Sequence, residues 1–193
     1  IRGFDSELAL NAMLSSHQPG GAMGMRYNDV ADYLRLGYSP LKDPPKPFGS
    51  AGRTVEHAAS AWAVAQYGKA LGREDIYDTF MKRSGNWRNL FDAETGFIRP
   101  KLKDGSWREP FDPLMDANGK GFVEANSWQT TWMATYDVEG LAQLLGGHDQ
   151  YCEKLNFAFE NSRQAKFTGK YGEGYVSFGN QPGLPMAHLF NYV

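Results

Sequence analysis

The sequence has one cysteine, no long apolar run and no excess of either charge. The lone Cys152 cannot form an intrachain disulfide, and its place in a helical apolar pattern predicts buried packing. No segment approaches the roughly 20 apolar residues of a membrane-spanning helix, so we predict no membrane insertion. The 22 acidic and 20 basic residues are mixed along the chain and give a net charge of −2. This balance argues against a nucleic-acid-binding or membrane-surface protein.

The chain is, by contrast, rich in aromatic residues, glycine and proline. Aromatic residues make up 14% of the 193 positions, and there are 22 glycines and 10 prolines. A chain of this length can bury one sizeable core. Frequent glycine and proline beside many aromatic rings favour helices joined by long, structured loops that carry a ligand site.

Apolar spacing and turn residues predict a mostly helical chain with a small hairpin. Asp5 is the expected N-cap of the first helix, and Gly37 is the expected left-handed C-cap of the second. Thr54–Leu71 is apolar nearly all round, which is typical of a buried helix. The pair Asp104-Gly105 predicts the turn of a β-hairpin within residues 95–107. The other expected helices are 27–36, 74–89, 128–136, 138–145, one that begins at His148 and a last one after Pro182.

The stretch Gly121–Trp132 places one carboxylate among two tryptophans and two amide side chains. A carboxyl group that aromatic surface shields from water loses hydration of its charged form, so it keeps its proton to a higher pH and can act as a proton donor. We therefore predict that Glu124 is a general acid. Asn126 or Ser127 is expected to cap the helix that follows and so to hold Glu124 on a rigid turn.

The residues beside Glu124 have the chemistry of a sugar site. The indole faces of Trp128 and Trp132 suit the apolar faces of sugar rings, and the amides of Asn126 and Gln129 suit hydroxyl groups. A plainer interpretation is also open from the residues alone. In it, Glu124 is a surface acid before a helix whose tryptophans are core residues.

The same stretch resembles the signature G-x-x-E-G-N-A-W-Q-Y-T-W of glycoside hydrolase family 92, the calcium-dependent exo-α-mannosidases. Four further segments resemble other signatures of that family in the same order: Ser50–Trp62, Asn89–Phe97, Asp137–Gly146 and Tyr175–Tyr192. In the central signature Ala125 replaces glycine and Ser127 replaces alanine. In the first segment Ala59 and Ser60 replace the paired aspartates of the family, while Glu56 is kept as a further candidate acid.

This resemblance, which covers nearly the whole chain, implies an all-α fold: part of an (α/α)6 toroid with long loops and a small β-hairpin. It implies that residues 1–193 are a partial helical catalytic domain, an excerpt of a longer chain. The expected partners within that chain are the rest of the catalytic domain and an N-terminal β-rich domain. Family members are secreted, periplasmic or on the cell surface, and the resemblance implies the same location here.

The resemblance also implies a mechanism and a metal ion. An inverting glycosidase needs an acid and a base carboxyl group roughly 6.5–9.5 Å apart. Glu124 matches the family's acid, while the family's base aspartates lie downstream of the last matching helix, so the excerpt alone is expected to be inactive. The turn Phe178–Pro182 resembles the family's G-N-E-P or G-N-Q-P turn beside bound Ca²⁺. This implies that Asn180 and Gln181 provide part of the calcium shell.

The residues before Asn180 bear on the linkage that is cleaved. Family members acting on α-1,2 bonds carry a His-Glu pair there, and this chain has Phe178-Gly179, which favours another linkage. The resemblance thus implies an exo-acting inverting α-mannosidase that removes terminal α-mannosides from glycans, as in N-glycan degradation. Two alternatives stay open: a non-catalytic carbohydrate-binding fragment, and another α/α-toroid glycosidase or a lyase acting on a different sugar.

Overall fold

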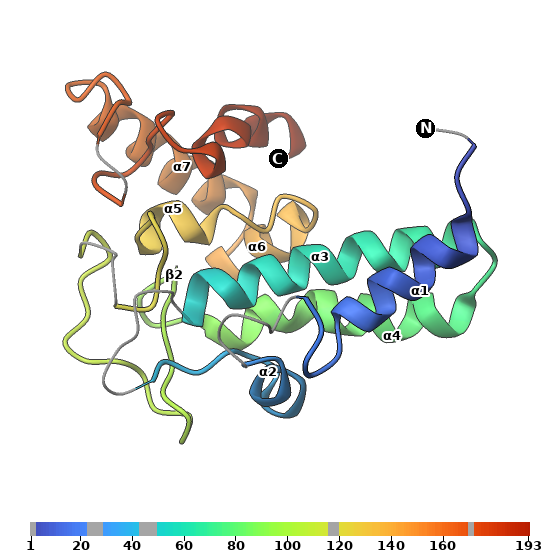
Figure 1. Cartoon of the computed structure of the whole chain (residues 1–193). Helices are drawn as coiled ribbons and strands as arrows, with labels where there is room; N and C mark the ends of the chain where they lie inside the picture. The colour runs from blue at the N-terminus through green and yellow to red at the C-terminus, as the bar shows by residue number, and fades with distance from the viewer. Residues whose placement is uncertain (1–2, 23–28, 43–49, 116–119, 170–171) are drawn as a thin grey trace.

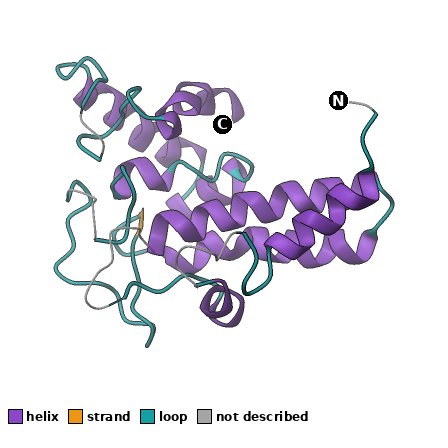
Figure 2. Ribbon diagram, in the orientation of Figure 1, coloured by secondary structure: helices purple, strands orange, loops and turns teal. Residues whose placement is uncertain are grey.

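The computed structural model describes residues 3–22, 29–42, 50–115, 120–169 and 172–193, and consists of helices and one small sheet (Figures 1 and 2). In chain order the elements are α1 (Ser6–Ser16), α2 (Val30–Leu36), α3 (Ser50–Ala70), α4 (Glu74–Ser84), the 3-10 helix η1 (Gly85–Leu90), β1 (Phe91–Asp92), β2 (Phe97–Ile98), α5 (Ser127–Thr131), α6 (Val138–Leu145), α7 (His148–Ser162) and the 3-10 helix η2 (Gln181–Tyr192). The predicted all-α class with a small β-hairpin is confirmed.

The long helix α3 lies against α4, with α1 along the same pair (Figure 1). The helices α3 and α4 approach closely at Gly68, which has no Cβ; a Cβ there would lie only 2.8 Å from Ile76 Cγ2. The first turns of α3 are mostly buried, as the apolar pattern predicts, and the helix begins at Ser50 rather than Thr54. The prediction that this helix is buried all round is wrong in its second half, where Trp62 and Ala63 are exposed. A small core between α1, α3 and α4 contains Leu10, Ala61, Val64, Ala65, Ile76 and Phe80.

The predicted helix ends follow local capping chemistry. Asp5 Oδ1 accepts a hydrogen bond from Leu8 N at 2.9 Å, which satisfies a free donor of the first turn of α1. Gly37 ends α2 with φ 76°, a conformation that glycine adopts without steric cost. Residues 27–28 of the predicted second helix lie outside the described residues. The helix predicted at 74–89 is α-helical only to Ser84 and continues as η1.

The β-hairpin forms, but its ladder lies earlier in the chain than predicted. Strands β1 and β2 pair antiparallel, with Phe91 opposite Ile98 and Asp92 opposite Phe97. The predicted Asp104-Gly105 turn is present as well, closed by a single bridge between Lys101 and Trp107. The chain therefore forms two successive antiparallel turns, and β2 lies between the first turn and the second.

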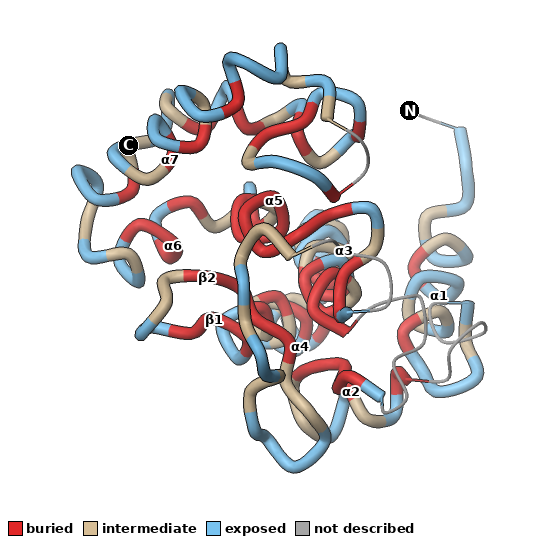
Figure 3. The backbone as a smooth tube through the Cα atoms, turned by 90° about the vertical axis from the view of Figure 1, so that its left-hand side faces the viewer, coloured by how far each residue is buried: buried red, intermediate tan, exposed pale blue. Residues whose placement is uncertain are grey.

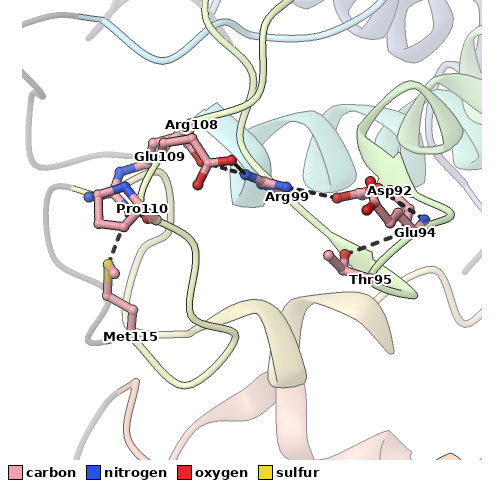
Figure 4. A network of polar contacts seen from close by, with 8 residues as sticks. All are labelled: Asp92, Glu94, Thr95, Arg99, Arg108, Glu109, Pro110 and Met115. Carbon is pink, nitrogen blue, oxygen red and sulfur yellow. Dashed lines mark hydrogen bonds and ion pairs between the residues drawn. The ribbon is translucent and has the colours of Figure 1, made fainter.

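Arg99, which is itself buried, joins these turns through a polar network (Figure 4). Its Nη1 lies 2.9 Å from Asp92 Oδ2, and its Nη2 donates to Arg108 O at 3.0 Å and also contacts Glu109. Burial tends to raise the pKa of Asp92, but hydrogen bonds from Arg99, from the Glu94 main chain and from a threonine hydroxyl outweigh it and hold that pKa below its usual value. The carboxylate of Asp92 is thus charged and paired inside the protein.

The main core lies between α3, α5, α6, α7 and the sheet, where the buried parts of these elements converge (Figure 3). Every residue of α5 is buried, and the fully buried large side chains there include Trp87, Trp132, Tyr151, Leu141 and Leu155. The helix predicted at 128–136 is wrong in its second half, because α5 ends at Thr131. Beyond it, Met133 N donates to Thr130 O and Asp137 N to Ala134 O, which are tight turns rather than α-helical bonds.

The C-terminal helices lie where the sequence predicts them, but the last helix differs in type, and one residue, Cys152, is less buried than predicted. The helices α6 and α7 occur where predicted, separated by Gly146 and Gly147 at φ 105° and 126°. The last predicted helix is 3-10 rather than α and contains Pro185, which has no N–H to donate. Cys152 is half-buried rather than buried. No helix in the described part of the chain is long and apolar enough to cross a membrane.

Two histidines are buried between α1, α2 and α3. His17 is 4% exposed, with Nε2 3.2 Å from Ser60 Oγ and its ring edge against Phe80. His57 is 5% exposed, and its Nε2 lies 4.0 Å from Asp29 Oδ1. Burial is the main reason that the pKa of each falls from 6.5 to about 4; Arg83 adds to this for His17, while for His57 the carboxylate of Asp29 opposes it. Both histidines are therefore neutral in the folded protein at neutral pH.

We expect this pair to make the fold sensitive to acid. In the unfolded chain His17 and His57 bind protons near pH 6.5, but in the folded chain only near pH 4. The free energy of unfolding is therefore not reduced by these histidines above pH 6.5, and it falls as the pH drops from 6.5 toward 4. The loss is on the order of 3 kcal/mol for a buried histidine. Urea unfolding at several pH values measures this slope. His17→Gln should reduce it and the exposed His148→Gln should not; an equal slope in both variants would contradict the assignment.

Candidate active site

A pocket of about 390 Å³ opens where α3, the turn at Glu124 and the start of η2 meet. It brings together four of the predicted candidates, Glu56, Glu124, Asn180 and Gln181. Its other lining residues are Gly52, Val123, Ala125, Thr130, Met133 and Pro182. Segments far apart in sequence thus contribute a carboxylate from each of two elements, and amide groups from a third.

The turn at Glu124 is held from both sides. Glu124 has φ 49°, an unusual conformation for a residue other than glycine, and its side chain is exposed. Its main-chain oxygen accepts a hydrogen bond from Asn180 Nδ2 at 3.0 Å, which ties the turn to the start of η2. Gly121 O accepts from Ala51 N at 2.8 Å, which ties it to the start of α3. A strained residue fixed in this way is typical of functional sites.

Asn126 and Gln129 use their amide groups within the protein. Asn126 caps α5 as predicted, since its Oδ1 accepts from Gln129 N at 3.1 Å. Asn126 Nδ2 also donates to Gly172 O and Gly174 O, each at 2.9 Å, and Gln129 Nε2 donates to Glu173 O at 2.9 Å. Both side chains are buried and fix the segment 172–174 above α5. Neither residue lines the pocket of Glu124, and their predicted contact with sugar hydroxyls stays a prediction.

The two tryptophans belong to the core. Trp132 is 1% exposed and meets Tyr151 edge to face at 5.2 Å between ring centroids. Trp128 is 8% exposed and packs edge to face against Phe97 and Tyr175. Neither lines the pocket of Glu124, so these two rings do not give this carboxylate the expected aromatic shielding. Trp128 lies on α5, which is buried on all sides, and Trp132 follows directly after it, so both rings enter the hydrophobic core.

Glu56 and Thr130 add polar groups to the pocket. Glu56 is exposed at the pocket, but the surrounding protein removes part of its hydration and raises its pKa above the usual value; the positive charge of Arg53 opposes this. Thr130 Oγ1 is buried and makes no hydrogen bond, which is costly for a hydroxyl group unless a ligand or water supplies a partner. The sequence alone did not single out Thr130. The sequence did contain an indication, because Thr130 stands where the family signature has tyrosine.

Phe178 and Gly179 precede the pocket without lining it. Phe178 is 40% exposed and stacks on Phe167 with 5.2 Å between ring centroids. Gly179 N donates to Ser177 Oγ at 3.3 Å. Asn180 then caps η2, because its Oδ1 accepts from Gln181 N at 2.9 Å. The pair predicted to govern linkage thus stands directly before the residue that joins η2 to Glu124.

The amide oxygens of Asn180 and Gln181 are hard ligands of the kind that Ca²⁺ prefers, and both residues line the pocket. Among the described residues no group of three or more histidine, cysteine or acidic side chains is placed to hold a metal ion. A calcium ion takes 6–8 oxygen ligands, as a rule. The donor set therefore fits part of a calcium shell and would need further oxygens from substrate, water or other parts of the protein.

Comparison with known proteins defines the class of this chain. The profile of the glycosyl hydrolase family 92 catalytic domain matches residues 1–193. The chain belongs to glycosyl hydrolase family 92. A curated relative from the fungus Arthroderma benhamiae, described as an uncharacterized secreted glycosidase, is 26% identical over 165 residues; the match covers 74% of this chain and 20% of the relative.

Solved structures give the same result for the fold. An inverting family 92 mannosidase from Bacteroides thetaiotaomicron is 29% identical, with a TM-score of 0.80 over 98% of this chain and 27% of its own. A family 92 α-mannosidase from the same bacterium, in complex with mannoimidazole, is 29% identical, with a TM-score of 0.84 over 100% of this chain and 25% of its own. The prediction of a partial helical toroid is confirmed by this likeness. The chain spans about a quarter of the length of these relatives.

Proposed function

We propose that this chain is part of the catalytic domain of an exo-acting inverting α-mannosidase that removes terminal α-mannosides from glycans. The observation that carries the proposal is the pocket that joins the strained, exposed Glu124 to Asn180 and Gln181. Family membership and likeness to mannosidases, one of them bound to mannoimidazole, support this substrate class. The description of the fungal relative as secreted supports a location outside the cytoplasm.

In the proposed reaction Glu124 protonates the glycosidic oxygen as the bond to the anomeric carbon breaks, and it is left as a carboxylate. Water adds to the anomeric carbon from the opposite face and gives up a proton to a base. No aspartate among the described residues lines the pocket. We therefore propose that the base lies in a part of the catalytic domain that the relatives have and this chain does not span. The turn held by α3 and η2 keeps Glu124 in position for this step.

Asn180 and Gln181 would hold part of the shell of a calcium ion, which when bound polarises sugar hydroxyls and stabilises a distorted ring. Asn180 has a second task that the structure shows. Its amide nitrogen is bonded to the main chain of Glu124, so ligation through its oxygen would couple the metal site to the acid. Because Phe178-Gly179 stands where a His-Glu pair would grip an α-1,2-linked sugar, we propose cleavage of another α-linkage.

The proposal is tested with a panel of α-linked mannobioses, the protein that carries this chain, and a calcium chelator. We expect hydrolysis with inversion, weak on the α-1,2 disaccharide, and loss of activity in the chelator that added Ca²⁺ restores. Asn180→Asp keeps an oxygen ligand but loses the amide donor to Glu124 O, so it should still bind Ca²⁺ and show reduced activity. Asn180→Ala loses both groups and should lose calcium binding together with activity. Activity that is unchanged in the chelator would overturn the calcium assignment, and binding without hydrolysis would favour a carbohydrate-binding module.

A further inference from the structure

A second groove, shallow and open to solvent and of about 490 Å³, lies between the β1–β2 turn and α7, and it shares no lining residue with the pocket of Glu124. The turn contributes Glu94, and α7 contributes Gln150, Glu153, Lys154 and Phe157. Trp128 forms part of its wall. The groove thus combines aromatic surface with charged and amide side chains, which is the composition of a ligand site rather than of a plain solvent-exposed helix face.

Phe157 gives the groove an accessible aromatic ring. The residue is 48% exposed, although phenylalanine is normally buried. Its ring stacks on Trp128 with centroids 5.6 Å apart and planes at 21°, and it meets Tyr175 edge to face. The ring is therefore held at a fixed angle by two other aromatic residues while nearly half of the residue faces solvent. A preorganised aromatic face of this kind suits the C–H face of a sugar ring.

Lys154 gives the groove an ammonium group without an acceptor. Its Nζ lies 3.5 Å from the centroid of the Phe97 ring and 5.0 Å from that of Trp128. Burial lowers the pKa of Lys154 to about 8. Within the part of the chain that the structure describes, Nζ has neither a hydrogen-bond acceptor nor a carboxylate within 4.0 Å. A Cβ at Gly96 would come within 3.3 Å of Nζ, so the glycine leaves room for the ammonium group.

We infer that this groove is a second carbohydrate-binding site, which takes a neutral hexose unit of a glycan. The ring of Phe157 would carry the apolar face of the sugar. Lys154 and Gln150 would donate to hydroxyl oxygens, and Glu94 and Glu153 would accept from hydroxyl hydrogens. The site lies outside the pocket of the proposed hydrolysis, and the choice of mannan as its ligand rests on the proposed function.

The charges around the groove decide between neutral and anionic ligands. Lys154 alone would attract a carboxylate, but Glu94 and Glu153 also line the groove and are both exposed. One positive and two negative side chains repel an acidic sugar more than they attract it. A neutral sugar uses all three, because each hydroxyl group both donates and accepts. Binding is therefore expected to prefer neutral over acidic glycans.

The test uses the whole protein that carries this chain, in the Glu124→Gln background so that bound glycan is not consumed. Retardation in gels that contain neutral mannan measures polysaccharide binding, and mannoimidazole is added to occupy the catalytic pocket. We expect retardation that persists with mannoimidazole. Phe157→Leu, which keeps an apolar side chain without a ring, should weaken it roughly five- to tenfold, whereas Phe157→Tyr should keep it.

Two controls make the outcome specific. Phe4→Leu, at another exposed phenylalanine, should bind as the parent does. In the Glu124-containing protein, Phe157→Leu should leave kcat/KM for a small aryl α-mannoside within about twofold, because its ring lies outside the catalytic pocket. Complete loss of retardation with mannoimidazole, equal retardation by Phe157→Leu and its parent, or stronger retardation by polygalacturonate than by mannan would each overturn the inference. Loss of hydrolysis alone bears only on the proposed function.

Discussion

Replacing Glu124 with glutamine is expected to lower kcat/KM for α-linked mannobioses by roughly 10²–10⁴-fold, the contribution usual for a positioned general acid. Glutamine has nearly the same shape, so the turn tied to α3 and η2 should keep its geometry, but the amide has no proton of suitable acidity for the leaving oxygen. Initial rates with purified protein, together with an unchanged circular dichroism spectrum, measure this effect.

The leaving group separates acid catalysis from structural damage. A 2,4-dinitrophenolate leaves without protonation, so Glu124→Gln should lose far less activity on that mannoside than on a disaccharide. Glu7→Gln, an equivalent change at an exposed position on α1, is the matched control and should leave both rates unaltered. Equal losses on the two substrates would show that Glu124 is not the acid. The most informative positive result is therefore the ratio of the two losses.

Replacing Arg99 with methionine is expected to lower the free energy of unfolding by about 3–5 kcal/mol, because it leaves the carboxylate of Asp92 buried without its partner. The Arg99 side chain is 8% exposed and that of Asp92 is 6% exposed, so water cannot replace the lost ion pair. The change also removes the bond to Arg108 O that joins the two turns of the hairpin region. Chemical denaturation at pH 7 measures the difference.

Two variants isolate the buried pair. In Arg99→Met combined with Asp92→Asn, the buried charge is gone and the main-chain bond from Glu94 is kept, so the loss should be clearly smaller than in Arg99→Met alone. Glu109→Gln removes the other ion pair of Arg99, but the Glu109 side chain is 71% exposed, and the cost should stay below about 1 kcal/mol. If Arg99→Met alone lowered the free energy of unfolding no more than Glu109→Gln does, burial of the Arg99–Asp92 pair would not account for its contribution.

Local chemistry in the sequence was enough to predict most helix positions. The caps at Asp5 and Asn126 and the left-handed Gly37 depend on a few consecutive residues, and each occurs as expected. The boundaries failed where competing bonds were available. After Thr131 the chain closes tight turns instead of continuing the helix, and after Ser84 the α-helix tightens to 3-10. These choices depend on packing against other elements, which periodicity does not report.

The sequence by itself determined the helical class, the family signatures and the capped turn that carries Glu124. Only the tertiary structure decided what surrounds that carboxylate. It buried Trp128 in the core and brought Glu56, Thr130 and Asn180 beside Glu124 from other elements. The physical reason is that spacing along the chain fixes the face of a helix on which a side chain lies. Which of two apolar faces becomes core, and which polar groups meet across a pocket, is set by how separate elements pack.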